Sequence, residues 1–156
     1  MAILNYSTQI AAGKTVTEIQ QMLARAKAQA VLTEYDTEGV LIAISFRIIT
    51  RFGLMSFRLP ANIQKIYQVI VRDKRITPKL RTRDQACRVA WRIVKDWLEA
   101  QMAIVQAEMV DLEQVFLPYA QHPDGSTVYD ALKDRQFHGL ALPSSNTERT
   151  NGVQPQ

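Results

Sequence analysis

The strongest candidates for binding chemistry are basic side chains gathered in one stretch of the chain. Residues 72–95 hold nine Lys or Arg against two Asp, a net charge of +7. Guanidinium and ammonium groups bind phosphate, and a helix N-terminus adds unpaired N–H donors to such a site. The pattern therefore predicts a patch that binds nucleic acid or phosphate, made of Arg72, Lys74, Arg75, Lys79, Arg81, Arg83, Arg88, Arg92 and Lys95.

Three further residues are candidates for binding. Trp91 lies at the edge of the apolar stripe of the same segment, where an indole ring is able to stack on a base. Arg47 and Arg58 fall on one face of the predicted strands. The alternative interpretation of the patch is a solvated helix face, in which cations pair with neighbouring carboxylates as Asp84–Arg88, Arg92–Asp96 and Lys95–Glu99.

The charge changes sign immediately after the patch. Residues 96–124 hold no Lys or Arg and six Asp or Glu, a net charge of −6. The two ends of one helical region thus carry opposite fields. This separation predicts either attraction of an anion to the basic end or antiparallel association of two copies.

Residues suited to catalysis are not arranged in a known pattern. Cys87 has no partner at catalytic spacing and is predicted to be a buried structural thiol. His122 and His138 lie in loop-like sequence, and neither is spaced with a second metal ligand. The six glycines form no phosphate loop, and no serine lies in a nucleophile-elbow motif. The sequence therefore favours a non-catalytic protein without a metal site or cofactor.

One long amphipathic helix, predicted from Thr82 to about Glu108, carries much of the basic patch. The stretch contains no glycine or proline, and its apolar residues recur with the helical period. Thr82 followed by Gln85 has the spacing of a capping box, which predicts the start of the helix. Trp97 is central to the apolar stripe and is predicted to be core, while Glu108 interrupts the stripe and marks its end.

The remaining pattern predicts an α+β fold, with an antiparallel sheet packed on one face by helices in the order β-α-β-β-β-α-α. A capping box at Thr15 and Glu18 predicts a helix after the first strand, and Asn62 is the predicted cap of another. Turn residues at 36–39 and 51–53 separate the hairpin strands. The predicted strands are 2–10, 30–35, 40–49 and 54–59, and short helical segments are expected near 112–116 and 127–133.

Alternation along the central strands predicts which sheet face is buried. The face expected to hold the helices consists of Val40, Ile42, Ile44, Phe46 and Ile48, continued by Met55, Phe57 and Leu59. The other face is expected to be half apolar through Leu41, Ala43, Leu54 and Ser56. Met102 and Met109 of the long helix are expected to extend this apolar surface. We therefore expect a two-fold homodimer that covers it. The alternative is that residues 112–132 fold back over this surface within one chain.

Residues 1–133 are expected to form a single α+β domain. Residues 134–156 form a C-terminal extension, which from about residue 142 has almost nothing to bury and is expected to be disordered. The longest apolar run is too short to span a membrane, the N-terminal residues lack a signal-peptide pattern, and one cysteine excludes an internal disulfide. These features favour a cytoplasmic protein without a membrane partner.

Three segments carry a resemblance to other proteins. They are Phe57-Arg58-Leu59-Pro60-Ala61-Asn62, the helix motif RVAWRIVKDWLEAQ of residues 88–101, and Val115-Phe116-Leu117-Pro118-Tyr119. In these segments the chain resembles a family of small proteins of phages, prophages and other mobile elements, and the resemblance runs from the N-terminal segment to about Tyr129. The family has no established activity, so the resemblance implies only a setting, the DNA metabolism of a mobile element or interference with host defences.

Taken together, the patch and the resemblance predict a non-catalytic accessory protein of a phage or mobile element that binds DNA or RNA. The protein is expected to act in the cytoplasm of the host cell. The alternative is an inhibitor of a host defence system, which would bind a host protein or sequester a nucleotide.

Overall fold

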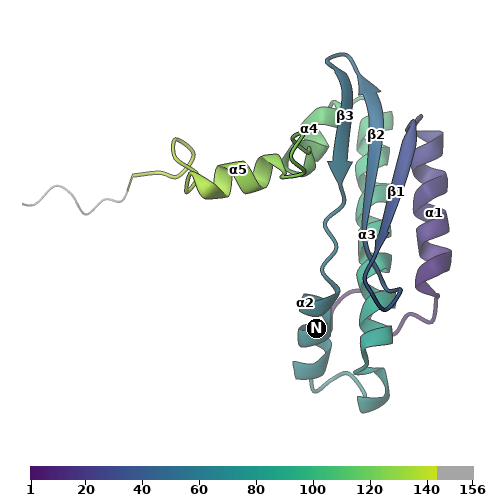
Figure 1. Cartoon of the computed structure of the whole chain (residues 1–156). Coiled ribbons are helices and arrows are strands. Elements are labelled where there is room, and N and C mark those ends of the chain that lie inside the picture. Colours follow the sequence, from purple (N-terminus) through teal and green to yellow (C-terminus); the bar gives the residue numbers. More distant parts are fainter. Residues whose placement is uncertain (144–156) are drawn as a thin grey trace, which may run out of the picture.

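The computed structural model describes residues 1–143 and has the expected α+β fold. Its three strands form one antiparallel sheet in the order β1-β2-β3. Figure 1 shows the long helix α3 running behind the sheet, with α1 beside it. In chain order the elements are α1 (Ala12–Arg25), β1 (Ala30–Tyr35), β2 (Leu41–Thr50), β3 (Gly53–Arg58), α2 (Ile63–Arg72), η1 (Pro78–Leu80), α3 (Arg83–Gln106), α4 (Leu112–Phe116), η2 (Leu117–Tyr119) and α5 (Val128–Asp134).

The long helix α3 begins where the sequence predicts. The Thr82 hydroxyl oxygen accepts a hydrogen bond from the backbone N–H of Gln85 at 3.1 Å. In a capping box the Gln85 side chain would accept a hydrogen bond from the backbone N–H of Thr82. Here the Gln85 amide instead donates to the backbone carbonyls of Tyr6 and Thr8, both at 2.9 Å. The start of α3 therefore also holds the N-terminal segment in place.

Other helix ends agree with the sequence pattern in part. Asn62 caps α2 by accepting a hydrogen bond from the backbone N–H of Lys65 at 3.0 Å. Glu108 has a φ of 56° just beyond the end of α3, as expected for a helix terminus. The predicted cap at Thr15 is wrong, because α1 already begins at Ala12 and Thr15 is fully buried inside the helix. Packing of Ala12 against the core extends α1 by one turn.

The predicted first strand at residues 2–10 is wrong. The segment contains turns, and Asn5 has a φ of 61°, which an extended strand does not allow. Ile3 and Tyr6 pack instead in a second apolar cluster between α2 and the start of α3, centred on Ile70, Ile76 and Ala86. Burial in this cluster replaces pairing with the sheet.

A β-bulge changes which residues of β2 face the core. The register pairs Glu34 with Ala43 and then Tyr35 with Leu41, so Ile42 is left unpaired. Leu41 thereby turns into the core, whereas Ile42 is 42% exposed. The inward face predicted from alternation is wrong at Ile42 and correct at the buried positions Ile44, Phe46 and Ile48.

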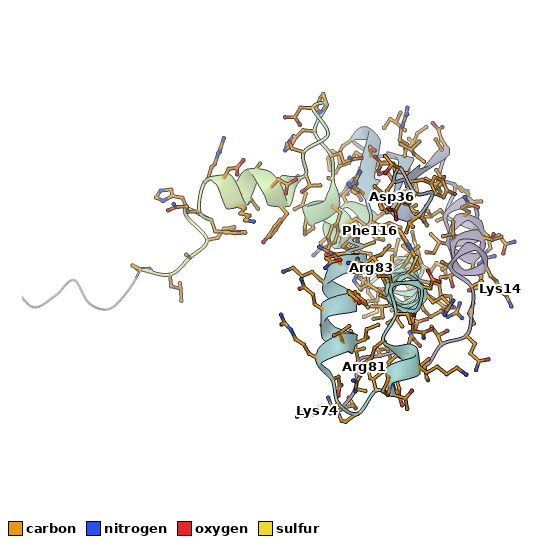
Figure 2. The ribbon with its side chains drawn as sticks, turned by 60° about the horizontal axis from the view of Figure 1, so that its bottom comes forward. Lys14, Asp36, Lys74, Arg81, Arg83 and Phe116 are labelled. Atoms are coloured by element: carbon orange, nitrogen blue, oxygen red, sulfur yellow. The ribbon has the colours of Figure 1, made fainter. Side chains whose placement is uncertain are left out.

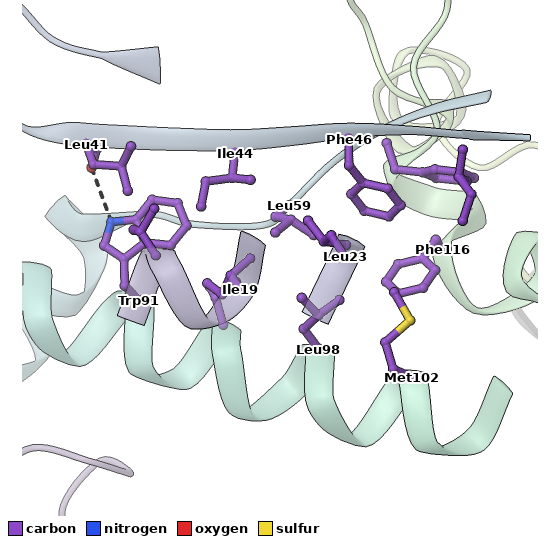
Figure 3. Packing of buried hydrophobic residues seen from close by; sticks show 14 of the residues in the cluster. Ile19, Leu23, Leu41, Ile44, Phe46, Leu59, Trp91, Leu98, Met102 and Phe116 are labelled. Carbon is purple, nitrogen blue, oxygen red and sulfur yellow. Dashed lines mark hydrogen bonds between the residues drawn. The ribbon is translucent and has the colours of Figure 1, made fainter. Parts of the chain in front are cut away.

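The main core lies between the sheet and helices α1, α3 and α4. Phe46 and Phe57 stack with their ring centroids 5.3 Å apart, and Phe116 of α4 meets Phe46 edge-on at 5.6 Å. Trp91 of α3 is fully buried, and its indole N–H donates to the Leu41 carbonyl at 3.2 Å (Figure 3). Offset and edge-on packing of this kind is favourable for aromatic rings.

The chain crosses to β3 after α4 and then leaves the body of the molecule. Ala120 forms a bridge with Phe57, and the Gln121 N–H donates to the Ser56 carbonyl at 2.8 Å. Thr127 starts α5 with a capping box, and α5 extends away from the sheet and helices (Figure 1). The helical segments expected near 112–116 and 127–133 are thus confirmed. The tail predicted to be disordered lies outside the described residues, except for its first positions.

The outer sheet face is not covered in the way the sequence suggested. Three residues assigned to an exposed apolar surface, Leu41, Ala43 and Met102, are buried, while Met109 is 71% exposed. Of residues 112–132, the loop of residues 121–125 lies against this face, whereas α5 points away from it. Its exposed apolar side chains are Leu32, Ile49 and Leu54.

Candidate nucleic-acid interface

Most of the predicted basic residues lie at the end of the molecule where α2 stops and α3 starts. Figure 2 brings this end forward and shows Lys74, Arg81 and Arg83 around the first turns of α3. Full burial of Ile76 anchors the connection between the two helices. Figure 2 places Lys14 of α1 on the other side of α3 from Lys74.

Two of the predicted cations, on the third and fourth turns of α3, are neutralised. Arg92 lies 2.6 Å from the carboxylate of Glu18, which comes from α1 rather than from the predicted Asp96. Lys95 lies 2.7 Å from Glu99, as the helical spacing predicted. The solvated-face interpretation therefore fits this part of the patch.

Two cations in the connection serve its local structure. Arg75 donates two hydrogen bonds to the Asp73 carboxylate, both at 2.8 Å. These bonds hold the pKa of Asp73 at about 2, so the pair stays ionised across the neutral pH range. Arg81 donates to the backbone carbonyls of Ile76 at 3.0 Å and of Asp73 at 3.3 Å. Arg75 and Arg81 thus shape the connection, and Arg75 adds no net charge to the patch.

Six predicted cations have no carboxylate at ion-pair distance within residues 1–143, and one of them, Arg81, is bound to backbone carbonyls. Arg83 donates to the side-chain oxygen of Gln64 at 2.8 Å and lies over the ring of Tyr67, 4.6 Å from its centroid. Arg88 donates to the side-chain oxygen of Gln85 at 3.0 Å. These neutral partners orient the guanidinium groups without cancelling their charge. Besides Arg81, the set consists of Arg72, Lys74, Lys79, Arg83 and Arg88.

An open cleft of about 810 Å³ lies beside these cations, between the β1–β2 hairpin and the first turns of α1, α2 and α3. Three helix N-termini converge on it, and each adds partial positive charge. Arg83 and Arg88 line the cleft, but so do the carboxylates of Asp36, Glu38 and Asp84. Because these side-chain charges nearly cancel, the interior of the cleft suits a small polar ligand.

Cys87 lines this cleft and is a reporter for it. It is half-buried, and burial raises the pKa of its thiol, with a smaller contribution from the charge of Asp84. Since the thiolate is the reactive form, we expect iodoacetamide to label Cys87 more slowly in the folded than in the urea-unfolded protein near pH 8. The difference should shrink as the pH rises and both states ionise. Mass spectrometry of labelling against pH tests this, and equal rates near pH 8 would contradict it.

The other sequence candidates lie away from the basic end. Trp91 is fully buried, which corrects its assignment as a residue that stacks on a base. Arg58 pairs with Glu34 across the outer sheet face, and Arg47 is exposed on that same face. Trp97 is half-buried against Phe116, in agreement with its predicted core role.

Comparisons with known protein families, with curated proteins and with solved structures gave no significant match. The resemblance to mobile-element proteins therefore stays an expectation from the motifs. Within the described part of the chain, no helix is long and apolar enough to cross a membrane. In the same residues, no group of three or more His, Cys, Asp or Glu side chains is placed to hold a metal ion.

Proposed function

We propose that this protein is a non-catalytic accessory protein of a phage or other mobile element, which binds the backbone of DNA or RNA in the host cytoplasm. The proposed interface consists of the end of α2, the 73–82 connection and the first turns of α3. The observation that carries the proposal is the group of five cations there, besides the carbonyl-bound Arg81, that no carboxylate of residues 1–143 neutralises. Such cations contact phosphates, and phosphate contacts position a protein without reading sequence.

The number of available cations sets the expected salt dependence. Each neutralised phosphate of duplex DNA contributes about −0.9 to the slope of log K against log salt. If all five cations contact phosphates, the slope is roughly −4 to −5, and affinity falls by about 500-fold between 50 and 200 mM salt. Little preference among sequences is expected, because phosphate contacts carry no direct sequence information.

A double charge reversal tests the interface directly. Lys74→Glu combined with Lys79→Glu changes two exposed cations in the connection between α2 and α3. We expect affinity for nucleic acid to fall at least tenfold near 100 mM salt, and the salt slope to shrink by about two because two phosphate contacts are lost. Fluorescence anisotropy with labelled single-stranded DNA, duplex DNA and RNA measures both quantities.

The matched control makes the same charge change at the far end of α1. Arg25→Glu combined with Lys27→Glu alters two exposed cations about 20 Å from the first turn of that helix. This control should keep most of the affinity, and melting curves should show both variants folded. Unchanged affinity of the Lys74/Lys79 variant for all three nucleic acids, or an equal loss in the control, would reject the interface.

Sequestration of a nucleotide, as an inhibitor of host defence, is the second candidate function. The cleft of about 810 Å³ favours it, because small-molecule sites commonly have volumes of about 300–1,000 Å³. Native mass spectrometry after incubation with mixed mono-, di- and cyclic nucleotides should then show a retained ligand that slows labelling of Cys87. Arg88→Ala should lose this ligand, and the Lys74/Lys79 variant should keep it. Absence of a retained nucleotide together with unchanged Cys87 labelling would dismiss this candidate.

A further inference from the structure

Residues 128–140, which we call the arm, leave the body of the molecule, and Val128 at their start packs against the main core. Figure 1 shows α5 extending away from the sheet and helices, and no residue of α5 is buried. Tyr129 and Leu140 are 45% and 65% exposed, and the rings of Tyr129 and Phe137 lie 5.7 Å apart. A helix of seven residues is too short to be stable alone in water, so the arm needs a surface to pack on.

A groove on the outer sheet face leaves apolar side chains exposed among polar ones. Its volume is about 800 Å³, and it lies between β1, β2, β3 and the loop of residues 121–125. Leu32 and Leu54 line it and are 59% and 55% exposed. Arg47 also lines it and has no carboxylate at ion-pair distance within residues 1–143. The groove therefore offers apolar contacts beside one cation.

The connection between groove and arm prevents the arm from occupying the groove of its own chain. The loop of residues 121–125 forms one wall of the groove and leads directly into α5. Bridges from Ala120 to Phe57 and from Gln121 to Thr127 hold this loop, and the Val128 N–H donates to the Ala120 carbonyl at 2.9 Å. These bonds direct α5 outward, so that groove and arm lie side by side on one surface of the molecule.

We propose that two copies of this chain form a two-fold dimer by exchanging arms, each arm lying in the groove of the other copy. A two-fold axis beside the 121–125 loop places each arm against the groove of the other copy. This is possible because one surface of the chain carries both groove and arm and is therefore self-complementary. Tyr129 and Leu140 of one copy cover Leu32 and Leu54 of the second copy. The exposed Asp134 of the arm, which lies between Lys133 and Arg135, is the proposed partner of the unpaired Arg47 of the groove. This dimer requires no nucleic acid and stands apart from the proposed function.

Sedimentation equilibrium of the full chain measures the dissociation constant of the dimer. Leu32→Asp with Leu54→Asp alters the groove, and Tyr129→Asp with Leu140→Asp alters the arm. Each double variant should weaken the dimer at least tenfold, and because all four side chains are exposed, melting curves should stay near wild type. Val71→Asp is the control, since Val71 is 41% exposed on α2, outside the groove, and it should leave the dimer unchanged.

Two rescue experiments separate arm exchange from other modes of association. A mixture of groove and arm variants should form a heterodimer, because one intact arm meets one intact groove, whereas neither variant pairs with itself. Arg47→Glu and Asp134→Arg should each weaken the dimer, and their combination should restore it. A wild-type chain that is strictly monomeric at the highest attainable concentration would overturn the proposal and leave the groove to a different protein. Absence of both rescues would equally overturn it.

Discussion

Replacement of Phe116 by alanine is expected to lower the free energy of unfolding by about 3–5 kcal/mol. The ring is fully buried and joins α4 to the core. It meets Phe46 and Trp97 edge-on, with ring centroids 5.6 Å away in both cases. Alanine leaves a cavity between α4 and the sheet that these rings are unable to fill without leaving their favourable geometry.

Urea denaturation followed by far-UV circular dichroism measures this loss. Phe52→Ala is the matched control, because Phe52 is 72% exposed at the turn between β2 and β3 and packs only beneath the guanidinium of Arg51. The control is expected to cost less than about 1 kcal/mol. Similar losses in the two variants would mean that Phe116 is not packed as described.

Replacement of Trp91 by alanine is also expected to lower the free energy of unfolding by about 3–5 kcal/mol. The indole is fully buried and packs among the core side chains that α1 and the sheet contribute. Its N–H also donates to the carbonyl of Leu41, next to the β-bulge (Figure 3). Trp91→Phe keeps most of the apolar volume but leaves that carbonyl without its partner, which should cost about 1–3 kcal/mol.

The same denaturation experiment separates the two contributions of Trp91. Ile42→Ala is the control, because Ile42 is the unpaired residue of the bulge and is 42% exposed. It should change stability by less than about 1 kcal/mol. A stable Trp91→Ala variant would indicate that the indole lies at the surface, and would return Trp91 to the candidates for base stacking.

Helices, hairpins and their ends were predictable because they depend on neighbours along the chain. The period of apolar residues identified α3, and the side chains of Thr82 and Asn62 marked helix starts that the structure confirms. Turn residues between alternating segments identified both hairpins. Alternation failed at residues 2–10, because a strand also needs a sheet edge, and Ile3 and Tyr6 found burial against α2 and α3 instead.

The sequence identifies the residues of the basic patch, but tertiary structure determines which of them remain without a neutralising carboxylate. Counting residues locates a charge of +7, yet it does not reveal that Arg92 is neutralised by Glu18, which lies 74 positions earlier. Helical period placed Trp91 at the edge of the apolar stripe, and the sheet then covered it completely. Periodicity is a property of neighbours in sequence, whereas ion pairing and burial are properties of neighbours in space, which only the packing of α1 and the sheet on α3 supplies.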